Sequence, residues 1–155
     1  MAIRGITPFL WFDHQAEEAA RFYVSLFDNS RITHVSHYGD HGPLPKGTVM
    51  VIGFELDGRR YTALNGGPHY KLTGAFSLLV ECSEQAEIDR LWTALSEGSS
   101  PNVCGWLTDR FGLTWQINYA GLPELMAGGN GGRVMGAMMK MQKVDIQALK
   151  DAAAG

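Results

Sequence analysis

The chain repeats one order of predicted elements at a distance of about 70 residues, since its two leading strands start near positions 5 and 75. Apolar runs and alternating β-branched residues predict strands, and apolar residues three or four apart predict helices. The first copy is a strand, a helix and three strands, at 5–13, 14–27, 31–39, 48–58 and 59–67. The second copy is a strand, a helix and closing strands, at 75–82, 83–98, 103–109 and 113–120. The chain therefore contains two similar modules.

A four-stranded sheet with a single helix cannot bury both of its faces. Two copies can place their helices outside and leave a concave face between them. We therefore expect an α+β fold in which two βαβββ modules form a cupped mixed sheet. The paired modules occupy 1–120, at about 1–67 and 74–120, and 121–155 form a helical C-terminal arm.

The arm contains five of the seven methionines. Met135, Met138 and Met139 lie at helical spacing, and Asp145 is a plausible cap for a final helix. Such a stripe is more typical of packing than of a copper site. It predicts an arm that docks by its apolar side, either on its own sheet or on a second copy of the chain.

Charge and apolar length exclude several classes of partner. A formal net charge of −3 and the lack of a basic run argue against nucleic acid. The first apolar run, 3–12, is far too short to span a bilayer and follows no cleavable leader, so we expect no membrane partner. Two cysteines do not form a disulfide framework, which favours a reduced, cytoplasmic setting.

Four segments resemble a known family: "ITPFLWFD…AEEAARFYVSLF", "YTALNGGPHYKLTGAFSLLVEC", "CGWLTDRFGLTWQI" and "RVMGAMMKMQKVDIQAL". They are similar to the PhnB-like branch of the vicinal oxygen chelate superfamily, which includes glyoxalase I, extradiol dioxygenases and bleomycin-resistance proteins. This branch is often labelled 3-demethylubiquinone-9 3-methyltransferase. The resemblance covers nearly the whole chain and implies paired βαβββ modules and a homodimer. It implies little about chemistry, because one fold hosts many reactions.

Metal-dependent members of the superfamily direct His and Glu ligands into the cup from the first and last strands of each module. The resemblance places these positions at Thr7, Asn65, Ser77 and Gln116. All four are neutral, whereas a transition metal needs imidazole or anionic ligands to offset its dehydration. We therefore expect neither a tightly bound metal nor another cofactor at this site.

Neutral polar side chains in an apolar cup would each cost roughly 1–3 kcal/mol if they were left unpaired. A small polar organic ligand would satisfy them, although they could also bond one another or nearby backbone. Same-face strand neighbours would line the cup, and the aromatic ones are Phe9, Trp11, Tyr61 and Trp106. Trp115 and Ile117 alternate with Gln116 and are expected under the second helix.

These residues leave three functions open. The first is a metal-free site for a small organic molecule, in a binding protein or an enzyme. The second is a metal-dependent lyase, isomerase or dioxygenase, and the third is a sequestration protein similar to the bleomycin-resistance proteins. Glu55 is a candidate general base if the cup desolvates it and raises its pKa. Methyl transfer is unsupported, because no strand, Gly-rich turn and helix unit is present for S-adenosylmethionine.

Overall fold

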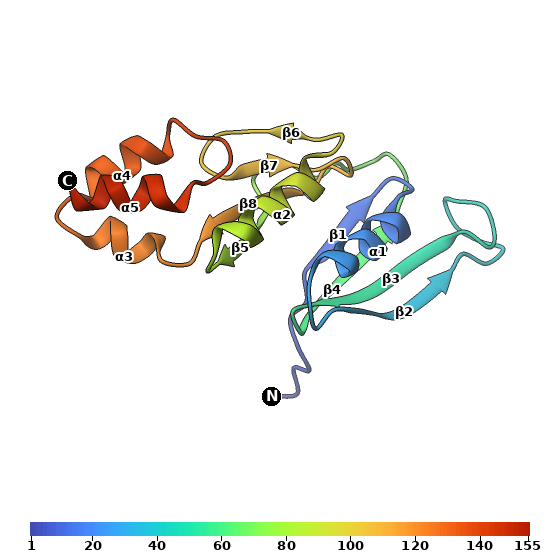
Figure 1. Ribbon diagram of the computed structural model, residues 1–155. Coiled ribbons are helices and arrows are strands. Elements are labelled where there is room, and N and C mark those ends of the chain that lie inside the picture. The colour runs from blue at the N-terminus through green and yellow to red at the C-terminus, as the bar shows by residue number, and fades with distance from the viewer. The chain divides into compact units, whose positions relative to one another are not determined.

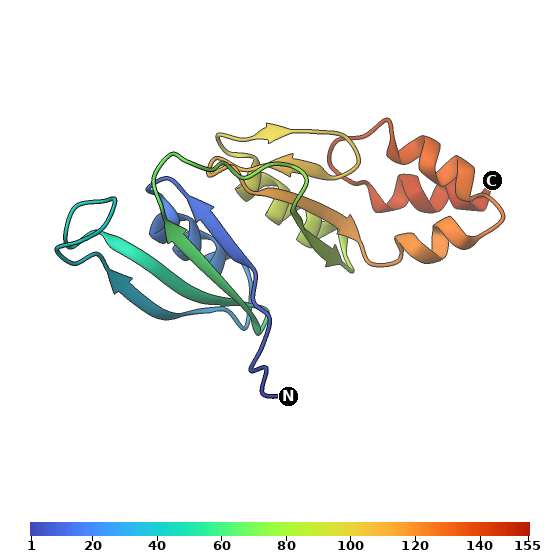
Figure 2. The ribbon, with the colours of Figure 1, turned by 180° about the vertical axis from the view of Figure 1, so that it is seen from behind.

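The computed structural model describes all residues, 1–155, and divides them into two compact units, Met1–Leu72 and Thr73–Gly155. Each unit contains one four-stranded mixed sheet with a helix on one face (Figures 1 and 2). This confirms the predicted α+β fold with two modules of similar element order. None of the helices is both long and apolar enough to cross a membrane.

The first module has the sheet order β1-β4-β3-β2, in which only the β1 and β4 pair is parallel. Its elements are β1 Phe9–Phe12, α1 Ala16–Leu26, β2 Arg31–His37, β3 Val49–Leu56 and β4 Arg59–Asn65. The turn between β3 and β4 has positive φ at Asp57 (47°) and Gly58 (72°). Both values suit a tight hairpin turn whose twist matches that of the strands, as the Asp-Gly pair predicts.

The core of the first module lies between its sheet and α1. Alternate residues of three strands turn the same way and are almost fully buried: Leu10, Phe12, Ile52, Phe54, Leu56 and Ala63. From α1 they meet Ala16, Ala19, Ala20 and Tyr23. Small alanines let the helix approach the sheet closely, while Tyr23 packs against the ring of Phe54 at 6.4 Å between centroids.

The second module repeats this topology, with the order β5-β8-β7-β6 and a parallel β5 and β8 pair. Its elements are β5 Ser77–Cys82, α2 Gln85–Ser96, β6 Ser100–Pro101, β7 Trp106–Thr108 and β8 Thr114–Tyr119. Trp115, Ile117 and Leu107 are buried together with Ile88, Leu91 and Leu95 of α2. The expected burial of Trp115 and Ile117 is therefore confirmed. The two-residue strand β6 is too short to leave a pattern in the sequence.

The C-terminal arm consists of α3 Leu122–Ala127, α4 Gly131–Met138 and α5 Ile146–Ala154. It packs on the second module of its own chain. Val134, Val144 and Leu149 are fully buried. Asp145 caps α5 as predicted, since its side chain accepts a hydrogen bond from the Ala148 amide at 2.9 Å.

Two sets of hydrogen bonds hold the arm on the module. The amides of Cys104 and Gly105 donate to the carbonyls of Met141 and Gln142, both at 2.8 Å. Gln85, at the start of α2, accepts from the Ile146 amide at 2.8 Å and donates to the Val144 carbonyl at 2.9 Å. Because these bonds satisfy backbone groups near the start of α5, they fix where the arm begins its last helix.

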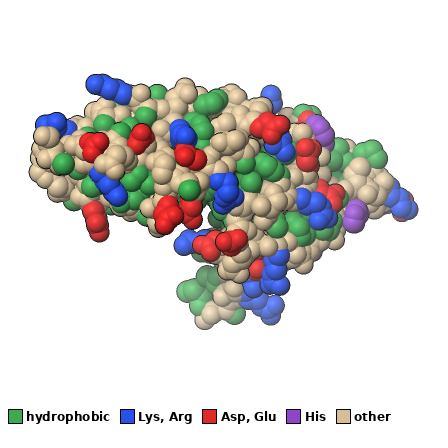
Figure 3. Space-filling model, viewed as in Figure 1, with side chains coloured by type: hydrophobic (Ala, Val, Ile, Leu, Met, Phe, Trp, Pro, Cys, Tyr) green, Lys and Arg blue, Asp and Glu red, His purple; other side chains and the backbone are tan.

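Acidic and basic side chains are interspersed on the face of the molecule in Figure 3. The exposed hydrophobic residues include Phe9 and Leu79, at 59% and 53%, which occupy β1 and β5 in the two modules. Both point away from the buried helix side, because their strand neighbours Leu10 and Val80 alternate with them. Each sheet therefore has one face that no helix of its own module covers, which we name its open face.

Candidate functional site

The open face of the second module contains a row of neutral polar side chains. Gln116 of β8 lies between Leu79 of β5 and Trp106 of β7 in the strand register. Its Nε2 donates a hydrogen bond to the Ser77 Oγ at 2.9 Å. Beside this pair, the hydroxyls of Thr108 and Thr114 share a hydrogen bond of 3.0 Å. Ser77, Trp106 and Gln116, which the sequence indicated, thus share one face of one sheet.

The Gln116 and Ser77 pair keeps part of its hydrogen-bonding capacity. An amide has two N–H donors and one oxygen acceptor, and the bond to Ser77 uses a single donor. The oxygen of Gln116 accepts no hydrogen bond from the protein, and the residue is half-buried. The amide of Gln116 therefore keeps one N–H donor and its oxygen acceptor, and Trp106 is its neighbour in the strand register.

The open face of the first module is aromatic. Trp11 donates from its indole Nε1 to the Gly67 carbonyl at 2.9 Å and meets the Tyr70 ring edge-on, with centroids 5.0 Å apart. Its ring lies so close to Gly66 that a Cβ there would stand 2.3 Å from Trp11 Cζ2. Only glycine permits this approach, so the indole has a fixed position. Thr7 is exposed and lies two residues before β1.

Two residues assigned to the cup lie on the opposite side of the first sheet. Tyr61 and Asn65 belong to the helix-facing row of β4, together with buried Ala63. Tyr61 stacks on the core ring of Phe54 at 5.5 Å, and burial raises the pKa of its phenol. The expected face is wrong by one residue of register, which exchanges the two sides of a strand. Thr62 and Leu64 are the β4 residues on the open face.

Asn65 is a structural residue in this position. It is 5% exposed, its Oδ1 accepts from the Ala16 amide at 2.7 Å, and its Nδ2 donates to the Val49 carbonyl at 3.0 Å. It thereby satisfies one of the free amides at the start of α1, the role usually taken by a local N-cap. Gln15, which occupies the N-cap position itself, makes no such side-chain bond.

Glu55 is not a desolvated base. The Arg31 Nε donates to its carboxylate at 2.8 Å, and Arg60 approaches to 3.9 Å. The hydrogen bond from Arg31 lowers the pKa of Glu55, and this effect outweighs the burial that would raise it. The condition that would make Glu55 a general base, a pKa raised by desolvation, is therefore not met, because two arginines flank the carboxylate.

Neither module brings three or more His, Cys, Asp or Glu side chains together in a group that could hold a metal ion. At the two positions of the second open face where the resemblance places metal ligands, the available donors are a hydroxyl and an amide, from Ser77 and Gln116. Such neutral oxygens do not fit a transition metal, which prefers thiolate, imidazole or carboxylate. The residues present on this face are better suited to organic functional groups.

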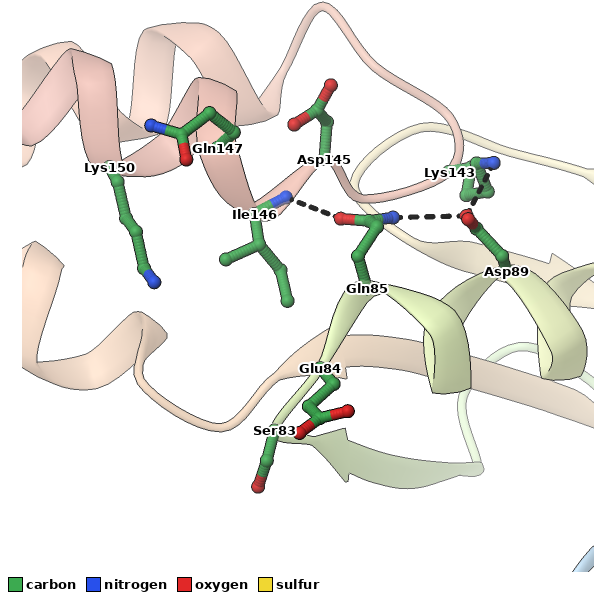
Figure 4. A pocket seen from close by; sticks show the side chains of 9 residues that line it. All are labelled: Ser83, Glu84, Gln85, Asp89, Lys143, Asp145, Ile146, Gln147 and Lys150. Carbon is green, nitrogen blue, oxygen red and sulfur yellow. Dashed lines mark hydrogen bonds and ion pairs between the residues drawn. The ribbon is translucent and has the colours of Figure 1, made fainter.

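A pocket of about 530 Å³ lies elsewhere in the second unit, at the junction of α2 and the arm (Figure 4). Its charged side chains are largely engaged with the protein: Lys143 pairs with Asp89 at 2.6 Å, and Asp145 caps α5. The hydrogen bond from Lys143, followed by that from Gln85, lowers the pKa of Asp89. No residue of the polar row lines this pocket, which we interpret as part of the arm's docking contact.

The sequence did not single out Thr108 or Thr114 as neighbours of Gln116, whereas Leu79 is one of the same-face neighbours expected beside Ser77. Thr114 could have been found by alternation along β8, two residues before Gln116. Thr108 and Leu79 depend on the pairing of β7 and β5 with β8. That pairing joins residues far apart in the chain and leaves no local signal.

Comparison with known proteins agrees with this architecture. A profile of the family described as 3-demethylubiquinone-9 3-methyltransferase matches residues 4–118, which include every strand of both modules except the last residue of β8. The chain belongs to this family. The matched segment ends before the arm, so α3, α4 and α5 lie outside it. No protein with a curated function matches the chain.

Solved structures of similar proteins extend the comparison. A PhnB protein from Bacillus cereus, described as a putative 3-demethylubiquinone-9 3-methyltransferase, is 35% identical, with a TM-score of 0.70. The match covers 76% of this chain and 100% of that protein. A protein from Pseudomonas aeruginosa is 26% identical, with a TM-score of 0.62, over 76% and 98% of the two chains.

A more distant match shows the fold alone. The fosfomycin resistance protein FosX from Mesorhizobium loti is 16% identical, with a TM-score of 0.55, over 81% of this chain and 98% of that one. The family is therefore shown by the sequence match, and the glyoxalase-type module by the structures. The chemistry has to be argued from the residues of this chain.

Proposed function

We propose that the open face of the second module binds a small organic molecule through uncharged hydrogen bonds. The observation behind the proposal is the Gln116 and Ser77 pair, in which the amide keeps one donor and one acceptor free on a half-buried sheet face. Two neutral side chains stand where the resemblance places metal ligands. The natural complement is a group with its own adjacent donor and acceptor, such as an amide, a carboxamide or a hydroxy ketone.

The neighbours of this pair supply apolar contact area. Trp106 and Leu79 flank Gln116 in the strand register, and Leu79 is 53% exposed. An aromatic ring and a leucine favour a ligand with a flat or apolar body beside its polar group. On the first module, Thr7, Phe9 and Trp11 are proposed as further ligand contacts, because Phe9 and Trp11 lie on its aromatic open face and Thr7 leads into the same strand.

The ion pair and the lowered pKa of Glu55 favour ligand binding without reaction over general-base catalysis by this residue. Its carboxylate is held by Arg31 and has a lowered pKa, so it is a weak proton acceptor. This supports the sequestration function as the second candidate, in which the ligand is held without reaction. We infer no methyl transfer from the family's description, since each module is a four-stranded mixed sheet without a doubly wound arrangement of strands and helices.

Ligand binding can be tested by a thermal-shift screen of small amides and hydroxy ketones on full-length, untagged protein. Any ligand found should bind Gln116→Leu about five- to thirtyfold more weakly, since a lost hydrogen bond in a half-buried site costs about 1–2 kcal/mol. The matched control is Gln142→Leu, at an exposed glutamine of the arm. Equal loss in both variants, or none in Gln116→Leu, would contradict the site.

Metal analysis of the same untagged protein tests the alternative function, that of a metal-dependent enzyme. A stoichiometric transition metal that depends on Gln116 and Ser77 would overturn the neutral-site proposal. Conversely, Gln116→Glu with Ser77→His should create zinc affinity, because the two side chains already lie within hydrogen-bonding distance. Product formation from a bound ligand would exclude pure sequestration.

A further inference from the structure

The arm brings two sulfur atoms together that are 35 residues apart in the chain. The Cys104 Sγ lies 3.6 Å from the Met139 Sδ, just beyond the end of α4. Cys104 is partly exposed, and Met139 is 57% exposed. Both residues therefore lie at the surface, at the contact between the arm and the module.

The backbone holds Cys104 in this position. Its φ is +62°, a left-handed conformation that costs a residue with a side chain roughly 1–2 kcal/mol. Its amide donates to the Met141 carbonyl, and the next amide, of Gly105, donates to the Gln142 carbonyl. These bonds join the cysteine loop to the segment directly after Met139, so the two sulfur atoms have little freedom to separate.

Packing does not account for the methionines on this side of α4. The buried stripe of the helix is Val134 and Met138, at 0% and 4% exposure. Met135 and Met139 are 45% and 57% exposed, and they lie one turn apart on the same side of the helix. A thioether at an exposed position contributes little to the core, and leucine or lysine would serve equally well there as helix formers.

We propose that Cys104 and Met139, with Met135 as a third ligand, form a binding site for a soft monovalent metal ion, Cu(I) or Ag(I). Thiolate and thioether ligands select such ions over Mg²⁺ or Ca²⁺. Two metal–sulfur bonds of about 2.3 Å at a tetrahedral or trigonal angle span about 3.8–4.0 Å. The observed 3.6 Å therefore needs only a small rotation of the exposed methionine. Binding releases the thiol proton to solvent, because the thiolate is the ligand.

This site is separate from the proposed ligand-binding face. Met135 and Met139 lie beyond residue 118, where the family match ends, and Cys104 precedes β7. Neither Gln116 nor Ser77 takes part. A protein that binds no Cu(I) would therefore not contradict the proposed ligand-binding function. A protein that binds no organic ligand would likewise not contradict the metal site.

The test is a Cu(I) titration of full-length, untagged protein under reducing, oxygen-free conditions, with bicinchoninate as the competing chromophoric chelator. Wild-type protein should withdraw one equivalent of Cu(I) from the chelator. Met139→Leu should weaken binding by more than about tenfold, and Cys104→Ser should weaken it further. Met126→Leu, in α3 of the same arm, is the matched control and should bind like wild type.

Two results would overturn the proposal. One is a wild-type protein that withdraws no Cu(I) from the chelator. The other is a Met139→Leu variant with wild-type affinity, which would show that a thiol alone binds the ion. Thermal unfolding of each variant verifies that it is folded, and Met139→Leu is expected to fold normally because the side chain is exposed. Cys82 is retained in every variant. Loss of Cu(I) binding in Cys104→Ser would therefore identify Cys104 as the thiol that binds the ion.

Discussion

Single residues of this chain combine structural roles that their sequence positions do not reveal. Asn65 ends a strand, yet its side chain caps a helix 49 residues earlier and its backbone carbonyl accepts from the Tyr38 hydroxyl at 2.6 Å. Asp109 accepts hydrogen bonds from the Phe111 and Leu113 amides and from the Trp115 indole. Asp109, which lies between Trp106 and Trp115 in the sequence, therefore shapes the turn into β8.

Replacing Asn65 by leucine should destabilise the protein by about 2–4 kcal/mol. The change removes the partners of the Ala16 amide and the Val49 carbonyl, and both groups are then left without a hydrogen bond at a mostly buried site. Urea unfolding measures the loss. Asn102→Leu is the control, since Asn102 is exposed and its side chain bonds only to the neighbouring Val103 amide. Equal stability of the two variants would contradict the capping role.

The two cysteines should differ in reactivity. Burial, followed by the charge of Glu87, raises the pKa of the Cys82 thiol to about 11, and the residue is 3% exposed. At pH 8 only about one Cys82 in a thousand is the reactive thiolate, and even that one is shielded. Iodoacetamide should therefore label Cys104 first, as peptide mass spectrometry can show. Equal rates at both thiols would show that Cys82 is accessible.

At the scale of elements, the arm depends on a close backbone approach. A Cβ at Gly105 would lie 2.5 Å from the Ile117 carbonyl oxygen and 2.9 Å from a methyl of Val144, and its φ is +78°. Gly105 therefore lets the arm segment that contains Val144 lie against β8. The buried Val144 and Leu149 then anchor α5.

Gly105→Ala should weaken arm docking and cost more than about 2 kcal/mol, because backbone strain adds to the clash. Gly112→Ala is the matched control, since its φ is +92° but no atom lies within 4 Å of the added Cβ. It should cost only the strain, about 1–2 kcal/mol. Thermal unfolding measures the stability of the two variants, and limited proteolysis measures how readily the arm is cleaved in each. Similar stability and cleavage in both variants would show that the close approach is unimportant.

At the scale of the whole molecule, both modules expose apolar residues on their open faces. Phe9 is 59% exposed and Leu79 is 53% exposed, so each open face leaves large apolar side chains in contact with water. The family resemblance implies a homodimer, and we retain this as a prediction. Covering part of either face would add about 25 cal/mol for each Å² of apolar surface removed from water.

The predicted homodimer should sediment with a mass of about 34 kDa, twice the 17.0 kDa of one chain. Sedimentation velocity over a range of concentrations at micromolar and higher levels provides the measurement. Phe9→Ser should shift the distribution toward the monomer if the first open face contributes to the contact. A single 17 kDa species at every concentration would contradict the prediction.

The order of elements could be predicted from the sequence because its signals are local. Alternation and helical spacing within each segment indicated both sheets and their helices, the Asp57-Gly58 pair indicated a hairpin, and Asp145 indicated the cap of α5. The same alternation placed Trp115 and Ile117 in the core and left Gln116 on the other face. These properties depend on residues that lie only a few positions apart in the sequence.

Other features arise from residues that meet only after folding. The register of β4 against β1 turned Tyr61 and Asn65 to the helix side, and a one-residue difference in a strand exchanges its faces. The pairing of β5 with β8 brought Ser77 to Gln116, 39 residues away, and arm docking brought Met139 to Cys104. Such contacts depend on the packing of distant segments, so local patterns in the chain contain no record of them.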